Sequence, residues 1–175
     1  RMKARIWGPL APLGLILAVF VFAADQAHKW WMLHVFKIAV GGRVAITPFF
    51  DLVLAWNKGV SYGLLNTDSQ WVFVVLNLLI CAVLWTWMSG LNRPISAAAI
   101  GLIMGGALGN IADRLIYGAV ADFFHLHWGA WSWYVFNVAE VAIVAGVARL
   151  LYESLPRRGG VVEQEVDVPV LALHF

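Results

Sequence analysis

The sequence predicts an integral membrane protein with four transmembrane helices and a small β-sheet cradle on the outer surface. Hydrophobic residues make up 62% of the 175 residues, whereas charged residues make up only 13%. An average soluble domain is about half apolar and about a quarter charged, so this chain has too few polar groups to cover a water-facing surface. Long apolar stretches and the placement of positive charges then predict the number and direction of the membrane crossings.

Composition also excludes several classes of protein. The formal net charge is +2, which is too small and too scattered for a nucleic-acid-binding surface, so we expect no nucleic-acid partner. The one cysteine, Cys81, lies inside an apolar run. Neither an internal disulfide nor a cysteine-based zinc site is therefore expected. The aromatic share of 14% suits side chains that anchor at membrane interfaces as well as side chains in a packed core.

Four apolar stretches are each about as long as the roughly 20-residue helix that crosses a bilayer. The expected spans are about 7–24, 70–89, 95–112 and 133–152, within one domain over residues 1–155. The basic start and small closing residues of the first stretch also resemble a cleavable signal peptide. We favour a retained helix, because the stretch is longer than the usual core of a signal peptide and three further spans follow it.

Positive charges predict the direction of these crossings, because short segments rich in Lys and Arg stay in the cytoplasm. Such residues precede the first span, link the second and third spans, and follow the fourth: Arg1, Lys3, Arg5, Arg93, Arg149, Arg157 and Arg158. Both termini are therefore expected in the cytoplasm, with outer loops at about 25–69 and 113–132. Further basic residues in the first outer loop weaken this bias.

The first outer loop contains two segments with the pattern of β-strands. Residues 43–47 and 49–56 are rich in β-forming residues, are separated by a proline and follow two glycines. This pattern is typical of short strands joined by turns, so we expect a small sheet on the outer membrane surface. At the other end of the chain, residues 156–175 combine glycines with acids and are expected to form a disordered cytoplasmic tail.

Ionisable residues within or beside the spans are candidates for function, because charge is costly inside a membrane. Asp25 and Lys29 stand at i,i+4 spacing at the end of the first span, which predicts an ion pair. Asn110, Asp113 and Arg114 fall at i, i+3 and i+4 at the outer end of the third span, so all three project from one helical face. Mutual neutralisation of the acid and the guanidinium is the structural alternative.

A row of small residues precedes this polar group on the third span. Gly101, Gly105 and Gly109 recur every four residues. Such a row lets another helix approach closely, and packing alone is a sufficient explanation for it.

Two further acids are expected to converge at the same membrane interface. Asp122 stands in an apolar segment, and Asn137 and Glu140 are at i,i+3 spacing at the start of the fourth span. Two carboxyl groups at low dielectric share a proton, so one can act as general base on water while the other donates a proton. Such a pair suits peptide hydrolysis by an aspartic mechanism. Isolated interfacial acids and a proton or ion pathway remain as alternatives.

Histidines offer a competing chemistry. His125 and His127 follow Asp122 closely, and two imidazoles with a carboxylate are a ligand set that zinc accepts. A loop at the membrane interface is also a natural place for amphipathic histidines, and we favour this structural interpretation. No metal and no other cofactor is therefore expected.

Several segments together resemble the lipoprotein signal peptidase family, signal peptidase II. The matching segments occur in the family's order and at its spacing: DQAHK at 25–29, NKGVSYG at 57–63, GGALGNIADR at 105–114, VADF at 120–123 and FNVAE at 136–140. The block GNxxDR is the most specific of these. The resemblance covers nearly the whole chain except the tail.

The resemblance implies an aspartic endopeptidase of the bacterial inner membrane with its active site at the periplasmic side. Such an enzyme removes signal peptides from diacylglyceryl-modified prolipoproteins, just before the lipidated cysteine. Its expected partners are these signal peptides, membrane lipids and the inhibitor globomycin, and it is expected to be a monomer. The resemblance implies catalytic roles for Asp122 and Glu140, substrate binding by Asn57, Asn110, Arg114 and Asn137, and support of the site by Asp25, Lys29, Gly109 and Asp113.

Glu140 departs from the family pattern, which has Asp at this position. The acid is retained, but the extra methylene displaces the carboxyl group, and a misplacement of about 1 Å can lower a rate about 100-fold. One alternative is therefore a catalytically impaired member or variant that binds substrate or globomycin without efficient cleavage. A second alternative is a small membrane transporter that uses the acids as a relay, although no internal repeat supports it.

Overall fold

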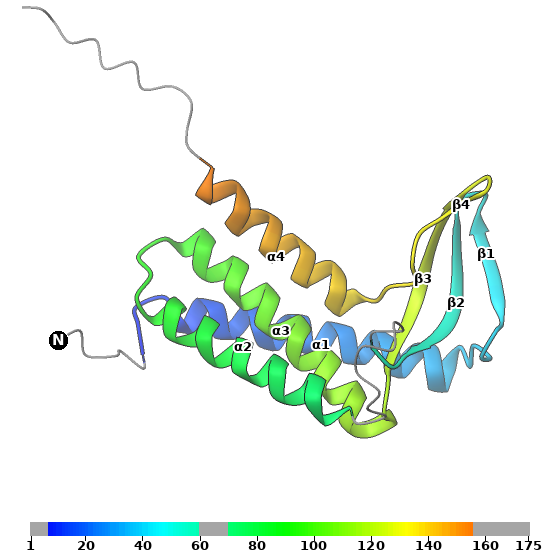
Figure 1. Ribbon diagram of the computed structural model, residues 1–175, viewed down its shortest axis with the longest axis horizontal. Helices are drawn as coiled ribbons and strands as arrows, with labels where there is room; N and C mark the ends of the chain where they lie inside the picture. The colour runs from blue at the N-terminus through cyan, green and yellow to red at the C-terminus, as the bar shows by residue number, and fades with distance from the viewer. Residues whose placement is uncertain (1–6, 60–69, 156–175) are drawn as a thin grey trace, which may run out of the picture.

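The computed structural model describes residues 7–59 and 70–155. Within these residues, four long helices form a bundle and a four-stranded sheet lies at one end of it (Figure 1). The helices are α1 Ala11–Trp30, α2 Trp71–Ser89, α3 Pro94–Tyr117 and α4 Val138–Ser154, and α1 continues into a π-helical turn, η1 Trp31–Val35. The strands are β1 Arg43–Thr47, β2 Phe50–Asn57, β3 Val120–Trp128 and β4 Trp131–Ser132.

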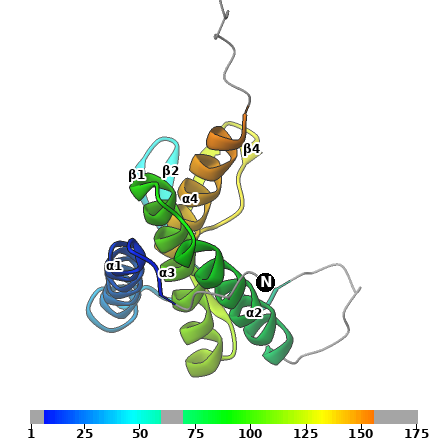
Figure 2. The same cartoon turned by 90° about the vertical axis from the view of Figure 1, so that its left-hand side faces the viewer.

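Helix α3 is the centre of the bundle, because it packs against α1, α2 and α4. The end-on view shows α3 between the other three helices (Figure 2). The glycines of α3 allow the close approach of α1: a Cβ atom at Gly105 would lie 2.5 Å from the carbonyl oxygen of Ala18, and one at Gly101 would lie 2.5 Å from that of Gly14. The predicted small-residue face is thus confirmed as a packing surface.

Three helical segments are long and apolar enough to cross a membrane: Ala11–Val35, Trp71–Ser89 and Pro94–Tyr117. Their outward side chains are large and apolar. Phe20 on α1 is 68% exposed and Leu79 on α2 is 60% exposed. A continuous apolar exterior of this kind is unfavourable in water and suits contact with lipid, as expected for an integral membrane protein.

The ends of three helices differ from the sequence prediction. The first helix does not end near residue 24 but continues through η1 to Val35, because the charges of Asp25 and Lys29 are neutralised inside the bundle. The third helix extends to Tyr117 and ends at Gly118, whose φ of 73° is a left-handed conformation that favours glycine.

The fourth helix begins later than predicted. Residues 133–137 are not helical, since the backbone N–H of Phe136 donates to the carbonyl oxygen of Phe124 and thereby joins this segment to β3. Helix α4 therefore has 17 residues. It is not among the three segments that meet the length and composition expected of a membrane span.

The sheet contains the two predicted strands, at β1 and β2, and two strands that were expected to be loop, β3 and β4. Its strand order is β1-β2-β3-β4 with antiparallel neighbours. An apolar cluster joins the sheet to the end of the first helix: Met32, Ile38, Leu54, Ala121 and Phe123. This attachment places β3 directly beside the outer part of the bundle.

The sheet lies at one end of the bundle, and the start of α1 and the end of α4 lie at the other (Figure 1). The start of α1, the link between α2 and α3, and the end of α4 all lie at the end of the bundle away from the sheet (Figure 1). Arg93 and Arg149 belong to this end. Three parts of the prediction lie outside the described residues. They are the other basic residues used to predict orientation, the predicted tail, and residues 60–63 of one family segment.

We predict that Gly105→Leu separates α1 from α3 and lowers the free energy of unfolding by roughly 1–3 kcal/mol, because overpacking strains a close contact. Thermal unfolding in detergent measures this change. Gly90→Ala is the matched control, since a Cβ atom there meets its nearest neighbour, the carbonyl oxygen of Trp87, at an ordinary 3.6 Å. Equal melting temperatures for both variants would contradict the proposed role of the small-residue face.

Candidate active site

A buried ion cluster lies where α1 and α3 meet below the sheet. The Lys29 ammonium contacts Asp25 Oδ2 and Asp113 Oδ2, each at 2.7 Å. All three residues are at most 1% exposed. Gln26 adds to the cluster by donating to Asp113 Oδ1 at 3.0 Å and to Asp25 Oδ2 at 3.2 Å. Buried charges are tolerated when they are paired and hydrogen-bonded in this way.

The sequence predicted only part of this cluster. The Asp25–Lys29 pair is present, but Lys29 is shared with Asp113. Neutralisation of Asp113 by its neighbour Arg114 was the structural alternative. Gln26 was missed, although it stands directly after Asp25 in the chain. Gly109 belongs to the same cluster because a Cβ atom there would lie 2.6 Å from Asp25 Oδ2.

The ion cluster also fixes the backbone before each candidate catalytic acid. Asp113 Oδ2 accepts a hydrogen bond from the backbone N–H of Ala121 at 3.1 Å. Asp25 Oδ1 accepts one from the backbone N–H of Ala139 at 2.9 Å. The residues that follow these two alanines are Asp122 and Glu140. One buried charge cluster therefore holds both chain segments that carry the acids.

Asn137 connects the two acids directly. Its Nδ2 atom donates to Asp122 Oδ1 at 2.6 Å, and its Oδ1 atom accepts from the backbone N–H of Glu140 at 2.8 Å. The second bond is a helix N-cap, which explains why α4 begins at Val138. Asn137 and Asp122 are at most 2% exposed, whereas Glu140 is half-buried. The side-chain atom Glu140 Oε2 is buried and has no hydrogen-bond partner within the described ranges.

Asp122 has an environment that suits proton transfer. Burial raises the pKa of Asp122 to about 6, against the opposite effect of the hydrogen bonds from Asn137 and Asn57. A carboxyl group with this pKa exchanges its proton near neutral pH, as a general acid or base requires.

The other predicted site residues surround this pair. Asn57 ends β2 and donates to Asp122. Asn110 Oδ1 accepts from Lys29 Nζ at 3.4 Å and from Asn137 Nδ2 at 3.3 Å, so it links the ion cluster to the two acids. Arg114 donates from one terminal nitrogen to the backbone oxygen of Asn110 at 3.2 Å. Its Nε atom is buried and has no partner among the residues described.

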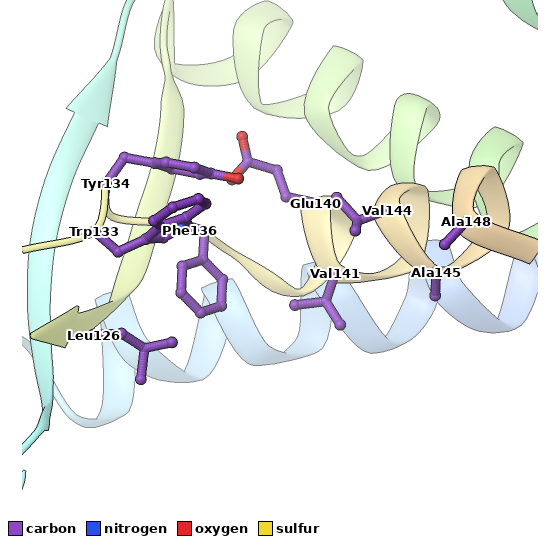
Figure 3. A pocket seen from close by; sticks show the side chains of 9 residues that line it. All are labelled: Leu126, Trp133, Tyr134, Phe136, Glu140, Val141, Val144, Ala145 and Ala148. Atoms are coloured by element: carbon purple, nitrogen blue, oxygen red, sulfur yellow. The ribbon is translucent and has the colours of Figure 1, made fainter. Parts of the chain in front are cut away.

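An apolar pocket of about 380 Å³ opens beside Glu140. It is lined by side chains of β3, of the segment before α4 and of α4 itself, and Glu140 is the one acid in this lining (Figure 3). The Tyr134 and Glu140 side chains point toward each other across it (Figure 3). Tyr134 lines this pocket but was not among the predicted site residues, because an exposed aromatic residue before a helix carries no specific signal.

The two histidines do not join Asp122. His125 and His127 lie on β3 with Asp51 of β2 close to both. Residues three apart in a strand point to opposite faces, so Asp122 and His125 are separated by the sheet itself. The metal alternative with Asp122 as a ligand is therefore wrong.

The fold and this site define an integral membrane protein with one acid on the sheet and one at the start of α4, where amide groups and a buried ion cluster hold the two chain segments that carry them. Comparisons with known proteins agree with that class. Residues 17–156 match the family described as Signal peptidase (SPase) II. A lipoprotein signal peptidase of Methylocella silvestris is 50% identical over 149 residues, which cover 82% of this chain and 85% of that protein. One of Nitrobacter hamburgensis is 49% identical over 151 residues, covering 82% and 92%.

Two solved structures are similar as well, both described as bacterial membrane enzymes determined by the in meso method. One, at 1.9 Å resolution, has a TM-score of 0.74 and 23% identity, covering 89% of this chain and 99% of that chain. The other, at 2.3 Å, has a TM-score of 0.70 and 25% identity, covering 80% and 85%. The chain therefore belongs to the signal peptidase II family, and the predicted function as a lipoprotein signal peptidase is confirmed.

We predict that Lys29→Met destabilises the protein by about 3–5 kcal/mol, because two buried carboxylates lose their shared cation. Thermal unfolding in detergent measures the loss. Lys37→Met is the control, because Lys37 is exposed and the substitution removes the same charge from the surface. A similar small effect of both substitutions would contradict the central role of the buried ion cluster.

Proposed function

We propose that this chain cleaves prolipoproteins just before their diacylglyceryl-modified cysteine, with Asp122 and Glu140 as the catalytic pair. The single observation that carries this proposal is the Asn137 side chain, which binds Asp122 and the backbone of Glu140 at once. A shared amide of this kind holds the Asp122 carboxyl group beside the first turn of α4, which carries Glu140, and two neighbouring carboxyl groups are what water activation by an aspartic mechanism requires.

In the proposed mechanism, Asp122 is the general base. Its ionised form is stabilised by the amide donors of Asn57 and Asn137. It takes a proton from water, which attacks the scissile carbonyl carbon. Glu140 starts protonated, hydrogen-bonds to the developing oxyanion and then protonates the leaving amine. No covalent intermediate forms.

The remaining polar residues position the substrate. Asn110 and Arg114 lie beside the acids, where they can hold the substrate backbone. The apolar pocket beside Glu140 has the character required for the hydrophobic part of a lipidated signal peptide. Substrate enters sideways from the lipid, so its acyl chains stay in the bilayer. Globomycin occupies the same cleft.

We propose that α4 is the fourth membrane crossing. Its 17 residues span about 26 Å at 1.5 Å per residue, and the extended segment before it supplies the rest of a bilayer core of about 30 Å. Both termini then lie in the cytoplasm, and the sheet and the acids lie at the periplasmic surface of the bacterial inner membrane. The protein acts as a monomer, and peptide cleavage needs no cofactor.

A catalytically impaired protein is the second candidate, and Glu140 is the observation that favours it. Its side chain is one methylene longer than the Asp of the family pattern, and its Oε2 atom lacks a hydrogen-bond partner among residues 7–59 and 70–155. In that case the protein binds lipidated peptide or globomycin with little turnover.

We predict that Asp122→Asn and Glu140→Gln each lower the rate of prolipoprotein cleavage by about 10²- to 10⁴-fold, because each removes one proton-transfer group. A gel-shift assay with diacylglyceryl-modified prolipoprotein in detergent measures cleavage, with and without globomycin and a chelator. Glu153→Gln is the matched control, as it makes the same substitution at the far end of α4. Full activity in either site variant would rule out this pair, and inhibition by the chelator with an unchanged melting temperature would favour a metal-dependent hydrolase.

Glu140→Asp separates the two candidate functions. If the extra methylene impairs catalysis, this variant cleaves up to about 100-fold faster than the parent chain, while both bind globomycin. Equal rates would show that Glu140 is fully competent and would exclude the impaired alternative.

We also predict that cleavage falls as the pH is lowered through about 6. Asp122 has a raised pKa of about 6, so it is protonated below this pH and can no longer accept a proton from water. The acidic limb of the pH profile of kcat/KM checks this expectation. A limb near pH 4, the range of an ordinary carboxyl group, would contradict the role of buried Asp122 as base.

A further inference from the structure

A second cluster of ligand-type side chains lies on the sheet, away from the two catalytic acids. Asp51 of β2 pairs directly with His125 of β3 in the antiparallel register. His127 is two residues further along β3, so its side chain lies on the same face of the sheet. The two imidazole rings stack with centroids 5.4 Å apart. The strand register thus places one carboxylate and two imidazoles together.

The distances in this cluster match those between ligands of one metal ion. Asp51 Oδ2 lies 2.8 Å from His127 Nε2 and 3.5 Å from His125 Nδ1. One ligating atom of each residue lies within 4.8 Å of the other two. Two ligands of a tetrahedral zinc ion are about 3.4 Å apart, given metal–ligand bonds of about 2.0–2.2 Å. Small side-chain rotations therefore suffice to bring the three atoms onto one ion.

Asp51 is itself an unusual residue for the edge of a membrane protein. Its side chain is 1% exposed, and its Oδ1 atom has no hydrogen-bond partner in the part of the chain that the structure describes. A buried carboxylate needs a compensating cation. Asp51 thus has one carboxylate oxygen without a partner in the described residues, beside the Oδ2 atom that faces Arg43 and the two histidines.

In the structure, the guanidinium group of Arg43 on β1 is the cation that pairs with the Asp51 carboxylate. One of its terminal nitrogens lies 2.6 Å from Asp51 Oδ2 and 3.2 Å from His127 Nε2, so it contacts two of the three candidate ligands. When it donates to His127, Nε2 presents a lone pair, which is the form that binds metal. The Arg43 side chain is 57% exposed, so its own charge can move into solvent when another cation takes its place beside the buried Asp51 carboxylate.

We propose that Asp51, His125 and His127 bind a divalent transition-metal cation, with Zn²⁺ as the favoured ion, and that Arg43 competes with it for the same place. Two nitrogen ligands and one oxygen ligand favour Zn²⁺ over Mg²⁺ and Ca²⁺, which prefer oxygen alone. A water molecule takes the fourth coordination position of the ion. The bound ion clips β2 to β3 on the face of β3 opposite to Asp122, so it stabilises the sheet and takes no part in peptide cleavage.

Zinc binding to the full-length protein, purified in detergent without a polyhistidine tag, tests this proposal. Competition with a chromophoric zinc indicator measures the affinity and stoichiometry, and Mg²⁺ serves as the negative control. The expected result is one Zn²⁺ per chain. A melting temperature that rises with zinc concentration is expected as well, because the ion binds the folded state.

Variants make the assignment specific. His127→Gln and Asp51→Asn each lower zinc affinity by at least about ten-fold, whereas His34→Gln, which changes an exposed histidine outside the cluster, leaves it unchanged. Arg43→Met raises the affinity because it removes the competitor, and this gain cannot arise from misfolding. Equal zinc binding by the parent chain and a His125→Gln/His127→Gln double variant, or no gain in Arg43→Met, would overturn the proposal.

Discussion

The ammonium group of Lys29, buried between Asp25 and Asp113, is the interaction on which the rest of the structure depends. It lies 2.7 Å from a carboxylate of α1 and 2.7 Å from a carboxylate of α3. None of these charges reaches solvent, so each is stable only while the others are in place. This mutual dependence explains how the first helix carries two charges in its outer half and still continues to Val35.

The same cluster positions the candidate active site. Its two carboxylates hold the backbone N–H groups of Ala121 and Ala139, each one residue before a proposed catalytic acid. Asn137 then joins the Asp122 side chain to the backbone of Glu140. The site is therefore built on rigid elements: the acids lie on a strand and on the first turn of a helix, and their supports come from the centre of the bundle. Support of this kind holds the groups of an active site in a fixed geometry.

The candidate site was largely predictable from the sequence because polar residues are rare in an apolar chain, so each one stands out. Asn110, Asp122 and Glu140 were found in this way and by resemblance to a family, and the structure brings them together. The contacts that each polar side chain makes were less predictable. The shared position of Lys29, the role of Gln26 and the pairing of Asp51 with the histidines involve residues that are far apart in the chain, and spacing carries no information about such contacts.

The sequence by itself determined the class of protein, the helical spans in outline, the family and the acids of the site. These properties follow from local composition, helical periodicity and short motifs, all of which are written in neighbouring residues. Only the tertiary structure decided where helices begin and end, that β3 and β4 are strands, and which cation each carboxylate contacts. Strand pairing and buried ion pairs depend on segments brought together by folding, as when Asp51 meets His125 across two strands, so their energies are absent from any local stretch of the chain.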